Sequence, residues 1–434
     1  MSTGLKALWQ RNRRIFSNVF SLSVMQGANY LMPLITLPYL VRVLGPSRYG
    51  LVELARAISM YFVVLTEYGF NLSATRAISM HRNDRRRVSE IFSAVLVLKL
   101  ILAIFSLAIL TGMVLAIPKL RAEWLVCFFA FGTVVGQSLF PFWLFQGLER
   151  MKYIAVLTII GKLVATVSIF LFIRRSDHYV YVPAVQSAGM LLMGVGGLVV
   201  SLRDLPVSLV WPSIAALRRE LARGWHLFVV KMTSTLNTTS NAVILGLLTS
   251  NEFVAYYAAG ERIVRAVQGL QFPLSQALFP HVGKLAAESQ AEALAFVGRV
   301  VKWVSGATLI VSIALFAFAP FVSRVVLGEA FEASVLVIRI LSPLPFVIGL
   351  SSFLGIQVMV NFGLKRTLTR IVVTAGVVNV ALALPLALAL EHRGVAIASL
   401  ATETLIAGAM YVCLHRKGVH IFGTGNSAGA DDDL

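Results

Sequence analysis

The stretch VSEIFSAVLVLKLILAIFSLAILTGMVLAI, residues 88–117, carries two charged side chains, Glu90 and Lys99, in 30 residues. A helix that crosses the hydrocarbon core of a bilayer needs about 20 mostly apolar residues, so this stretch is long enough to span a membrane. The whole chain has the same character. Of its 434 residues, 58% are hydrophobic and 13% are charged, and the mean hydropathy is +0.81. Soluble domains contain about 25% charged residues, so the composition excludes a soluble globular protein.

Eleven further apolar ranges of similar length predict an all-α integral membrane protein with twelve transmembrane helices. The twelve ranges are Val19–Val41, Leu51–Phe70, Val88–Ile117, Ala122–Phe145, Ile154–Ile173, Val180–Leu202, Gly224–Leu248, Phe253–Leu278, Val300–Val322, Val335–Val360, Leu368–Leu390 and Val395–Leu414. Six of them precede, and six follow, the longest connection. We therefore predict a six-helix bundle over residues 1–205, a cytoplasmic amphipathic linker over 206–223, a second six-helix bundle over 224–418 and a disordered tail over 419–434.

The positions of Lys and Arg predict the orientation, because these residues stay on the cytoplasmic side of short loops. With the N-terminus inside, the inner segments carry 22 Lys and Arg and the outer loops carry 8. Both termini are therefore expected in the cytoplasm of a multi-pass protein. This asymmetry also accounts for the net charge of +18. A nucleic-acid partner is not expected, because no polar stretch is long enough to fold as a domain that presents a basic patch.

Eight Lys and Arg residues remain inside the predicted spans, where a charge at the bilayer centre costs at least about 2.5–3.5 kcal/mol. Lys302 lies near the end of its span and is expected to reach the interface. The other seven are expected to line a central cationic cavity between the bundles, and structural pairing is the alternative for each. They are Arg56, Lys99, Lys162, Lys231, Arg262, Arg265 and Arg339. Such a cavity suits an anion, and phosphate in particular, because arginine binds it bidentately and lysine binds it as a point charge.

The spacing of the charges refines this expectation. Glu53, Arg56 and Glu67 share one helical face. Glu261 and Arg265 stand four residues apart and can pair within one helix, which is the structural alternative to a ligand role. Arg262 has no such local partner. The sequence therefore places a set of charges on two helices that are far apart in the chain.

Catalytic and metal-binding patterns are missing from the sequence. The two cysteines, Cys127 and Cys413, lie in apolar runs, and the seven histidines are scattered without metal-ligand spacing. We therefore expect no enzyme activity, no metal and no cofactor.

Several blocks of sequence resemble one family, the O-antigen and exopolysaccharide repeat-unit flippases (Wzx-type polysaccharide transporters) of the MATE-like flippase superfamily. The blocks are PLITLPYLVRVLGPSRYGL (33–51), EYGFNLSATR (67–76), PFWLFQGLERMKYI (141–154), NTTSNAVILG (237–246), YYAAGERIVRAVQGL (256–270) and PLSQALFP (273–280). They occur in the family's order. The resemblance implies twelve helices around a cationic cavity, alternating access, and a location in the bacterial inner membrane.

The resemblance also implies a substrate, an oligosaccharide repeat unit linked by pyrophosphate to undecaprenol, which moves from the cytoplasmic to the periplasmic leaflet. A polysaccharide polymerase and a chain-length regulator are the protein partners that such a role implies. Coupling to an H⁺ gradient, an Na⁺ gradient or the membrane potential stays open. Glu67, Glu261 and Glu403 are the candidates for ion coupling, and a sodium site from Asn241, Asn379 and Thr402 is a further one.

Two other functions stay open. A multidrug efflux transporter of the same superfamily is the first, but cationic drugs would need an anionic cavity. A membrane-embedded polysaccharide polymerase or ligase is the second, but the outer loops are roughly a dozen residues or shorter and leave little room for a catalytic site.

Overall fold

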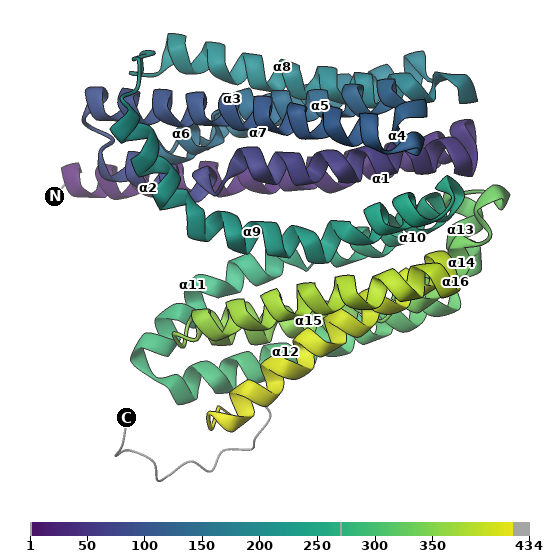
Figure 1. The fold of residues 1–434 in the computed structure, drawn as a ribbon. Coiled ribbons are helices and arrows are strands. Elements are labelled where there is room, and N and C mark those ends of the chain that lie inside the picture. Colours follow the sequence, from purple (N-terminus) through teal and green to yellow (C-terminus); the bar gives the residue numbers. More distant parts are fainter. Residues whose placement is uncertain (1, 270, 420–434) are drawn as a thin grey trace.

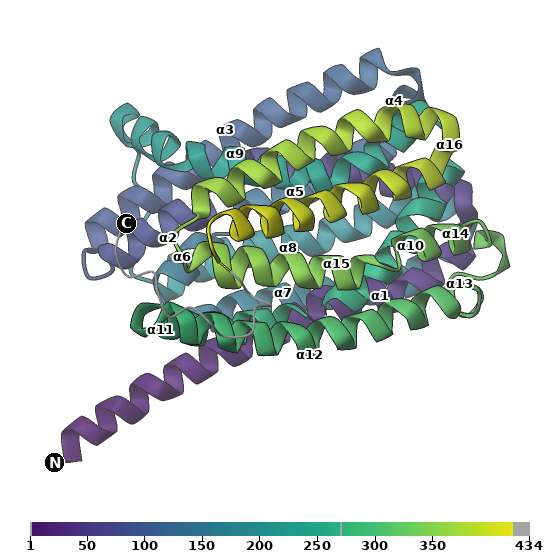
Figure 2. The same ribbon diagram turned by 90° about the horizontal axis from the view of Figure 1, so that it is seen from below.

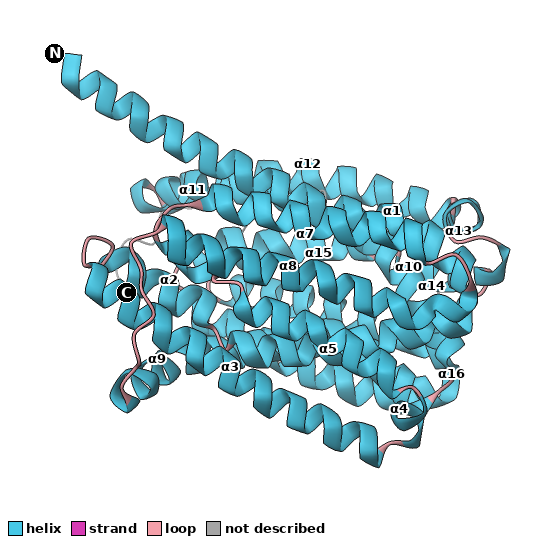
Figure 3. Cartoon of the chain, turned by 90° about the horizontal axis from the view of Figure 1, so that it is seen from above, coloured by secondary structure: helices cyan, strands magenta, loops and turns pink. Residues whose placement is uncertain are grey.

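The computed structural model describes residues 2–269 and 271–419, so most of the predicted tail (420–434) lies outside the described residues. Within these ranges every regular element is a helix (Figure 3). The helices are α1 (Ser2–Glu67), α2 (Phe70–Met80), α3 (Arg85–Ala116), α4 (Pro118–Ala122), α5 (Trp124–Leu139), α6 (Phe142–Gly147), α7 (Met151–Phe172), η1 (Ser176–Val180), α8 (Tyr181–Asp204), α9 (Ile214–Leu248), α10 (Asn251–Gly269), α11 (Phe272–Glu288), α12 (Gln290–Ala317), α13 (Ala319–Val326), η2 (Glu329–Phe331), α14 (Ser334–Leu341), α15 (Leu344–Ser352), η3 (Phe353–Val360) and α16 (Lys365–Arg416). The all-α expectation is confirmed.

Each of the twelve predicted ranges overlaps helix, but the count of twelve spans stays a prediction. In the described part of the chain, eight helical segments are long and apolar enough to cross a membrane. Two of these, residues 25–80 and 365–416, each overlap two predicted spans. The ranges Gly224–Leu248 and Phe253–Leu278 lie on α9, α10 and α11, outside those eight segments. These helices are more polar because they contribute charged side chains to the cavities described below.

Two long helices are interrupted by a residue with positive φ, and each interruption separates two predicted spans. The backbone breaks at Gly45 (φ 70°) in α1 and at Glu391 (φ 54°) in α16. The halves of α16 lie side by side and meet at the end of the molecule that carries α4 (Figure 2). A Cβ on Gly394 would overlap the backbone oxygen of Leu386 across this turn, so glycine is required for the close return of the chain.

The helices form two groups that approach each other at one end. Figure 1 shows α1, α3, α5, α7 and α8 in one group and α11, α12, α15 and α16 in the other, with α9 and α10 between them. α1 contacts both α9 and α10, α16 packs on α9, and α14 packs on α10. The groups come together near α4 and α13 and separate toward α2 and α11 (Figure 1). The division into bundles over residues 1–205 and 224–418 stays a prediction.

The predicted linker is part extended chain and part helix. Its first residues are held against α3, because the amides of Ser208 and Val210 donate to the hydroxyls of Ser89 (3.1 Å) and Ser93 (2.9 Å). The Ser213 hydroxyl caps α9, and this helix continues through residue 224 without a break. The amphipathic stretch is thus the first part of α9 and not a separate element, because no proline or turn sequence follows Pro212 to end the helix.

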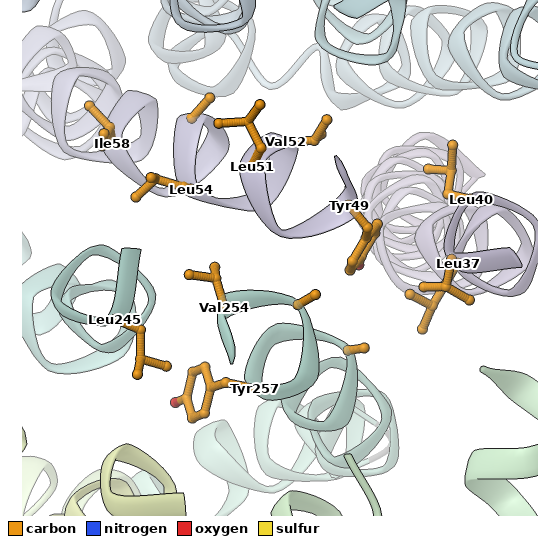
Figure 4. Close-up of a cluster of buried hydrophobic side chains, with 14 of the residues drawn as sticks. Leu37, Leu40, Tyr49, Leu51, Val52, Leu54, Ile58, Leu245, Val254 and Tyr257 are labelled. Atoms are coloured by element: carbon orange, nitrogen blue, oxygen red, sulfur yellow. The ribbon is translucent and has the colours of Figure 1, made fainter. Parts of the chain in front are cut away.

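A continuous apolar core joins the two groups where α1 meets α9 and α10. Figure 4 shows side chains of α1, among them Tyr49 and Leu54, opposite Leu245 of α9 and Val254 and Tyr257 of α10. All five are buried. The polar residues that follow on α1 and α10 are therefore held in a defined position relative to each other.

Candidate functional site

The first cavity lies mainly among the N-terminal helices and has a volume of about 430 Å³. We call it the N-side cavity. Its wall comes from α1, α5, α7 and α8, and Lys231 of α9 and Arg262 of α10 complete it. The charged residues of the wall are Arg56, Lys162, Lys231, Arg262 and Glu67. The wall therefore carries four cations and one carboxylate.

Glu53 connects two of these cations behind the wall. Its carboxylate is 3% exposed and accepts hydrogen bonds from Arg56 Nε (2.7 Å) and Arg262 Nη2 (2.8 Å). Arg262 Nη1 also donates to the hydroxyl of Tyr49 (3.0 Å). One carboxylate therefore holds two guanidinium groups in place and leaves a net positive charge. The Arg56 side chain is 51% exposed, so it remains available to a ligand.

A smaller cavity of about 190 Å³ adjoins the N-side cavity and shares Glu67 and Lys162 with it. Lys99 lines this space and is 1% exposed. Its Nζ donates to the backbone oxygen of Gln137 (2.8 Å) and lies 4.7 Å from the ring centroid of Trp143. Lys99 therefore has a protein partner and an aromatic contact, which fits the structural alternative better than it fits contact with a ligand.

The second cavity has a volume of about 600 Å³ and lies among α10, α11, α15 and η3. We call it the C-side cavity. Its described wall contains one charged residue, Arg265. This guanidinium donates twice to Glu261 Oε1, from Nε (3.0 Å) and from Nη2 (2.7 Å), so the pairing expected from the sequence spacing is present. Tyr257 also donates to Glu261 (3.1 Å) and receives a hydrogen bond from Asn241 (3.1 Å).

The seven predicted cations therefore separate into four locations. Arg56, Lys162, Lys231 and Arg262 line the N-side cavity, and Lys162 also lines the small cavity with Lys99. Arg265 lines the C-side cavity. Arg339 of α14 lines none of the three and lies 5.6 Å from the ring centroid of Phe316. The cations expected in a single central cavity thus line separate spaces in the structure.

The three carboxylates predicted for ion coupling lie in different surroundings. Glu67 faces the N-side cavity and accepts from Asn71 (3.1 Å), whereas Glu261 is held by Arg265. Glu403 of α16 interacts electrostatically with Arg265. Of the residues considered for sodium, Asn379 donates to Thr402 (3.2 Å), and Asn241 instead contacts Tyr257. No group of three His, Cys, Asp or Glu that could hold a metal occurs in the described part of the chain.

Sequence reasoning left out Glu53 and Tyr49 as site residues. Glu53 was visible as a neighbour of Arg56 at i, i+3, but nothing local indicates that it also binds Arg262, which is 209 residues away. Tyr49 gives no sequence signal, because its hydroxyl acquires a role only when α10 packs on α1. Gln137 likewise enters the site through its backbone oxygen.

Contacts close the two groups against each other at the end that carries α4 and α13. Lys119 Nζ donates to the backbone oxygens of Gly246 (2.7 Å) and Thr249 (2.8 Å) at the end of α9. Burial at this position lowers the pKa of the Lys119 ammonium. Arg42 donates to the backbone oxygen of Val325 on α13. A Cβ on Gly50 would overlap the backbone oxygen of Asn251, so glycine permits the closest approach of α1 and α10.

Comparison with known sequences identifies relatives over most of the chain. The family described as "Polysaccharide biosynthesis protein" matches residues 15–286. The chain is 32% identical over 393 residues to a protein of Escherichia coli (strain K12) named "Putative O-antigen transporter", and the match covers 91% of this chain and 95% of that protein.

Solved structures share the fold at low sequence identity. A structure described as the inward-facing conformation of a multidrug resistance MATE family transporter of the MOP superfamily has a TM-score of 0.72 and 17% identity, covering 89% of this chain and 94% of that one. Lipid II flippase MurJ in an inward closed conformation has a TM-score of 0.70 and 13% identity, covering 92% of this chain and 87% of that one. These likenesses establish the arrangement of the helices as one found in membrane transporters.

Proposed function

We propose that this chain, which belongs to the polysaccharide biosynthesis protein family, translocates an oligosaccharide repeat unit linked by pyrophosphate to undecaprenol from the cytoplasmic to the periplasmic leaflet. The relative from Escherichia coli is named as a transporter and MurJ as a flippase, and the chain is a multi-pass membrane protein. The proposal adds the particular lipid, the direction and the mechanism. In this proposal, the translocation supplies repeat units for the assembly of O-antigen or exopolysaccharide, and the protein lies in the inner membrane.

The observation that carries the proposal is the cationic wall of the N-side cavity. Arg56, Lys162, Lys231 and Arg262 surround one space, and the only described carboxylate in the wall is Glu67. A pyrophosphate brings negative charge and several acceptor oxygens, which arginine and lysine bind with charge-assisted hydrogen bonds. The volume of about 430 Å³ lies within the range of about 300–1,000 Å³ that is usual for ligand pockets.

The proposed mechanism separates the polar head of the substrate from its lipid tail. The pyrophosphate and the sugars occupy the cavities, and the undecaprenyl chain stays in the bilayer through a lateral gap between the helices. Moving one charge through a potential of 100 mV changes its free energy by about 2.3 kcal/mol. An inside-negative membrane therefore favours outward movement of an anionic head, and the membrane potential alone can supply a driving force.

The contacts of Lys119, Arg42 and Gly50 support alternating access. They hold the two groups together at the end that the distribution of Lys and Arg predicts to be periplasmic. The groups separate toward α2 and α11 at the other end (Figure 1). We propose that this arrangement is the state that receives substrate from the cytoplasm, and that both termini lie on that side.

Ion coupling is a further part of the proposal. Glu67 is the preferred site for proton coupling, because it faces the N-side cavity with Asn71 as a neutral partner, whereas Glu261 is neutralised by Arg265. A polysaccharide polymerase and a chain-length regulator are the proposed protein partners.

The charge of the N-side cavity also separates the proposal from its alternatives. In a multidrug efflux transporter, the four cations of this wall would repel a cationic drug. A polymerase or ligase would need an activated nucleophile or acid–base pair at the sugars, and among the described residues the N-side wall offers the single carboxylate Glu67.

Translocation of the lipid-linked repeat unit in proteoliposomes tests the proposal. We would compare the wild type with Arg56→Ala and Arg262→Ala at matched protein levels, with ethidium efflux as the test of the drug-transport alternative. We expect wild-type translocation, and its loss in both variants with retained folding. Absence of lipid translocation together with ethidium efflux would overturn the proposal.

A further inference from the structure

The C-side cavity, of about 600 Å³, is not explained by the binding of an anion. Its one cation, Arg265, is already held by two hydrogen bonds to Glu261. A pyrophosphate would therefore meet a neutralised guanidinium here, whereas the four cations of the N-side cavity share the two carboxylates Glu53 and Glu67 and leave a net positive charge. A neutral ligand fits this space better.

The polar groups in the wall of the C-side cavity are amides and hydroxyls. They come from Gln268, Gln271, Ser275 and Ser352. Apolar side chains lie between them, including Phe279 and Ile356, which are 36% and 42% exposed. Hydroxyl groups of a sugar both donate and accept, as amides and serines do, and the C–H faces of a sugar ring pack on apolar side chains. The wall therefore offers both kinds of contact that a saccharide needs.

Several of these polar groups have no protein partner. The Gln268 Nε2 atom is buried and makes no hydrogen bond to a described residue. The Ser352 hydroxyl likewise has none among the described residues, whereas Gln271 Nε2 donates to the backbone oxygen of Pro345 (2.8 Å) and keeps its Oε1 available to accept. A buried polar group without a partner is costly, so a rotation of the Gln268 side chain that brings its amide to a ligand in the cavity would be favoured.

This argument also decides against the lipid tail as the occupant. An undecaprenyl chain has no hydrogen-bonding group, and it would cover the Ser352 hydroxyl and the Gln271 Oε1 atom with hydrocarbon at a free-energy cost. A saccharide would instead form hydrogen bonds with these groups.

The position of the two cavities on α10 connects them to one substrate. Arg262 lines the N-side cavity and Arg265 lines the C-side cavity. Three residues of a helix correspond to a rise of about 4.5 Å. Sugars joined directly to a pyrophosphate at Arg262 therefore begin next to the C-side cavity.

We propose that the C-side cavity binds the saccharide part of the substrate, with Gln268, Gln271 and Ser352 as the residues that determine sugar specificity. This inference rests on the proposed function, because it assumes a lipid-linked saccharide. It divides the substrate between two sites, with the pyrophosphate in the N-side cavity and the sugars in the C-side cavity.

The test measures equilibrium binding of two lipids to the purified full-length protein. One is undecaprenyl pyrophosphate without sugar, and the other is the lipid-linked repeat unit extracted from the host that encodes the chain. We expect Gln268→Leu to weaken binding of the repeat unit about 10-fold, as for loss of one hydrogen bond in a buried site, and to leave binding of the bare lipid within about 2-fold. Arg56→Ala should weaken binding of both lipids to a similar degree.

Controls separate a local effect from loss of folding. Gln290→Leu makes the same chemical change at an exposed residue outside the cavity and should alter neither affinity. Ser352→Ala removes one oxygen atom from the wall. If Gln268→Leu does not fold, the same two binding measurements are made on Ser352→Ala. Tighter binding of the bare lipid in Gln268→Leu would assign the cavity to the undecaprenyl chain and overturn the inference, as would an equal loss of binding for both lipids in that variant, or unchanged binding of both lipids in Gln268→Leu and Ser352→Ala.

The failure of this inference is distinct from the failure of the proposed function. If wild-type proteoliposomes translocate neither lipid, the flippase function itself is wrong. If they translocate the repeat unit and the variants do not discriminate between the lipids, only the assignment of the C-side cavity is wrong.

Discussion

Arg262 Nη2 donates a hydrogen bond to Glu53 Oε1 over 2.8 Å, and this ion pair joins α10 to α1 across 209 residues of sequence. The same carboxylate holds Arg56 of its own helix. The pair therefore has two effects. It positions two cations at the wall of the N-side cavity, and it joins α10 to α1.

Loss of the shared carboxylate should destabilise the protein. Glu53→Ala leaves Arg56 and Arg262 without a counter-ion in a buried setting, and we expect a loss of about 3 kcal/mol in the free energy of unfolding, at the low end for a broken buried pair because Arg56 is half-exposed. Unfolding of the protein in detergent micelles measures this. Glu149→Ala removes an exposed partner of Arg82 and should cost less than about 1 kcal/mol. Equal losses in the two variants would contradict the shared role of Glu53.

Cations inside and outside the N-side cavity should differ in their effect on transport. Lys162→Ala removes a charge from the wall, and we expect translocation of the lipid-linked repeat unit to fall roughly 10-fold, as for loss of one charge-assisted hydrogen bond. Arg339→Met makes a comparable change at a residue outside the three cavities and should leave transport within about 2-fold. A larger loss of transport in Arg339→Met than in Lys162→Ala would show that a position in the N-side cavity does not identify the cations on which transport depends.

A side chain at residue 50 should prevent closure near α4 and α13. Gly50→Ala places a Cβ against the backbone oxygen of Asn251, so α1 and α10 must move apart. We expect a cysteine at Thr249 to react faster with a membrane-impermeant thiol reagent in this variant, in a background where Cys127 and Cys413 are replaced. Gly112→Ala is the matched control, because nothing lies within 4 Å of its added Cβ. Unchanged reactivity in Gly50→Ala would mean that closure does not depend on this approach.

The same closure should depend on pH through Lys119. Burial lowers the pKa of this lysine below its ordinary value of 10.5 when it contacts Gly246 and Thr249. The open state exposes Lys119 to water and should have the ordinary value, so the closed state binds fewer protons between the two values. Rising pH in that window therefore favours closure, and the effect ends above about pH 10.5.

Distances between spin labels at Arg121→Cys and Arg324→Cys, two exposed positions near α4 and α13, report the closure. We expect a larger short-distance population at the higher pH. The pH effect should vanish in Lys119→Met, and a pH effect of the same size in that variant would assign it to another group.

Most of the fold follows from local features of the sequence. Apolar ranges such as Val88–Ile117 become helices because a bilayer leaves a backbone no other way to satisfy its hydrogen bonds within one segment. Gly45 and Glu391 interrupt α1 and α16 between predicted spans. The more polar α9–α11 region is where local hydropathy is least informative, because its charged side chains face cavities that only the packed helices create.

The sequence by itself determined that this is an all-α membrane protein with cations inside its apolar regions, because the free energy of transfer into a bilayer depends on local composition. It also determined the pairing of Glu261 with Arg265, which depends on the pitch of one helix. The packing of the helices sets three further relationships: Arg262 joins Glu53, Arg339 lies apart from the three cavities, and Arg262 and Arg265 line different cavities. Those relationships depend on how helices that are distant in the sequence rotate and pack against each other. The local sequence around the residues involved does not indicate their partners.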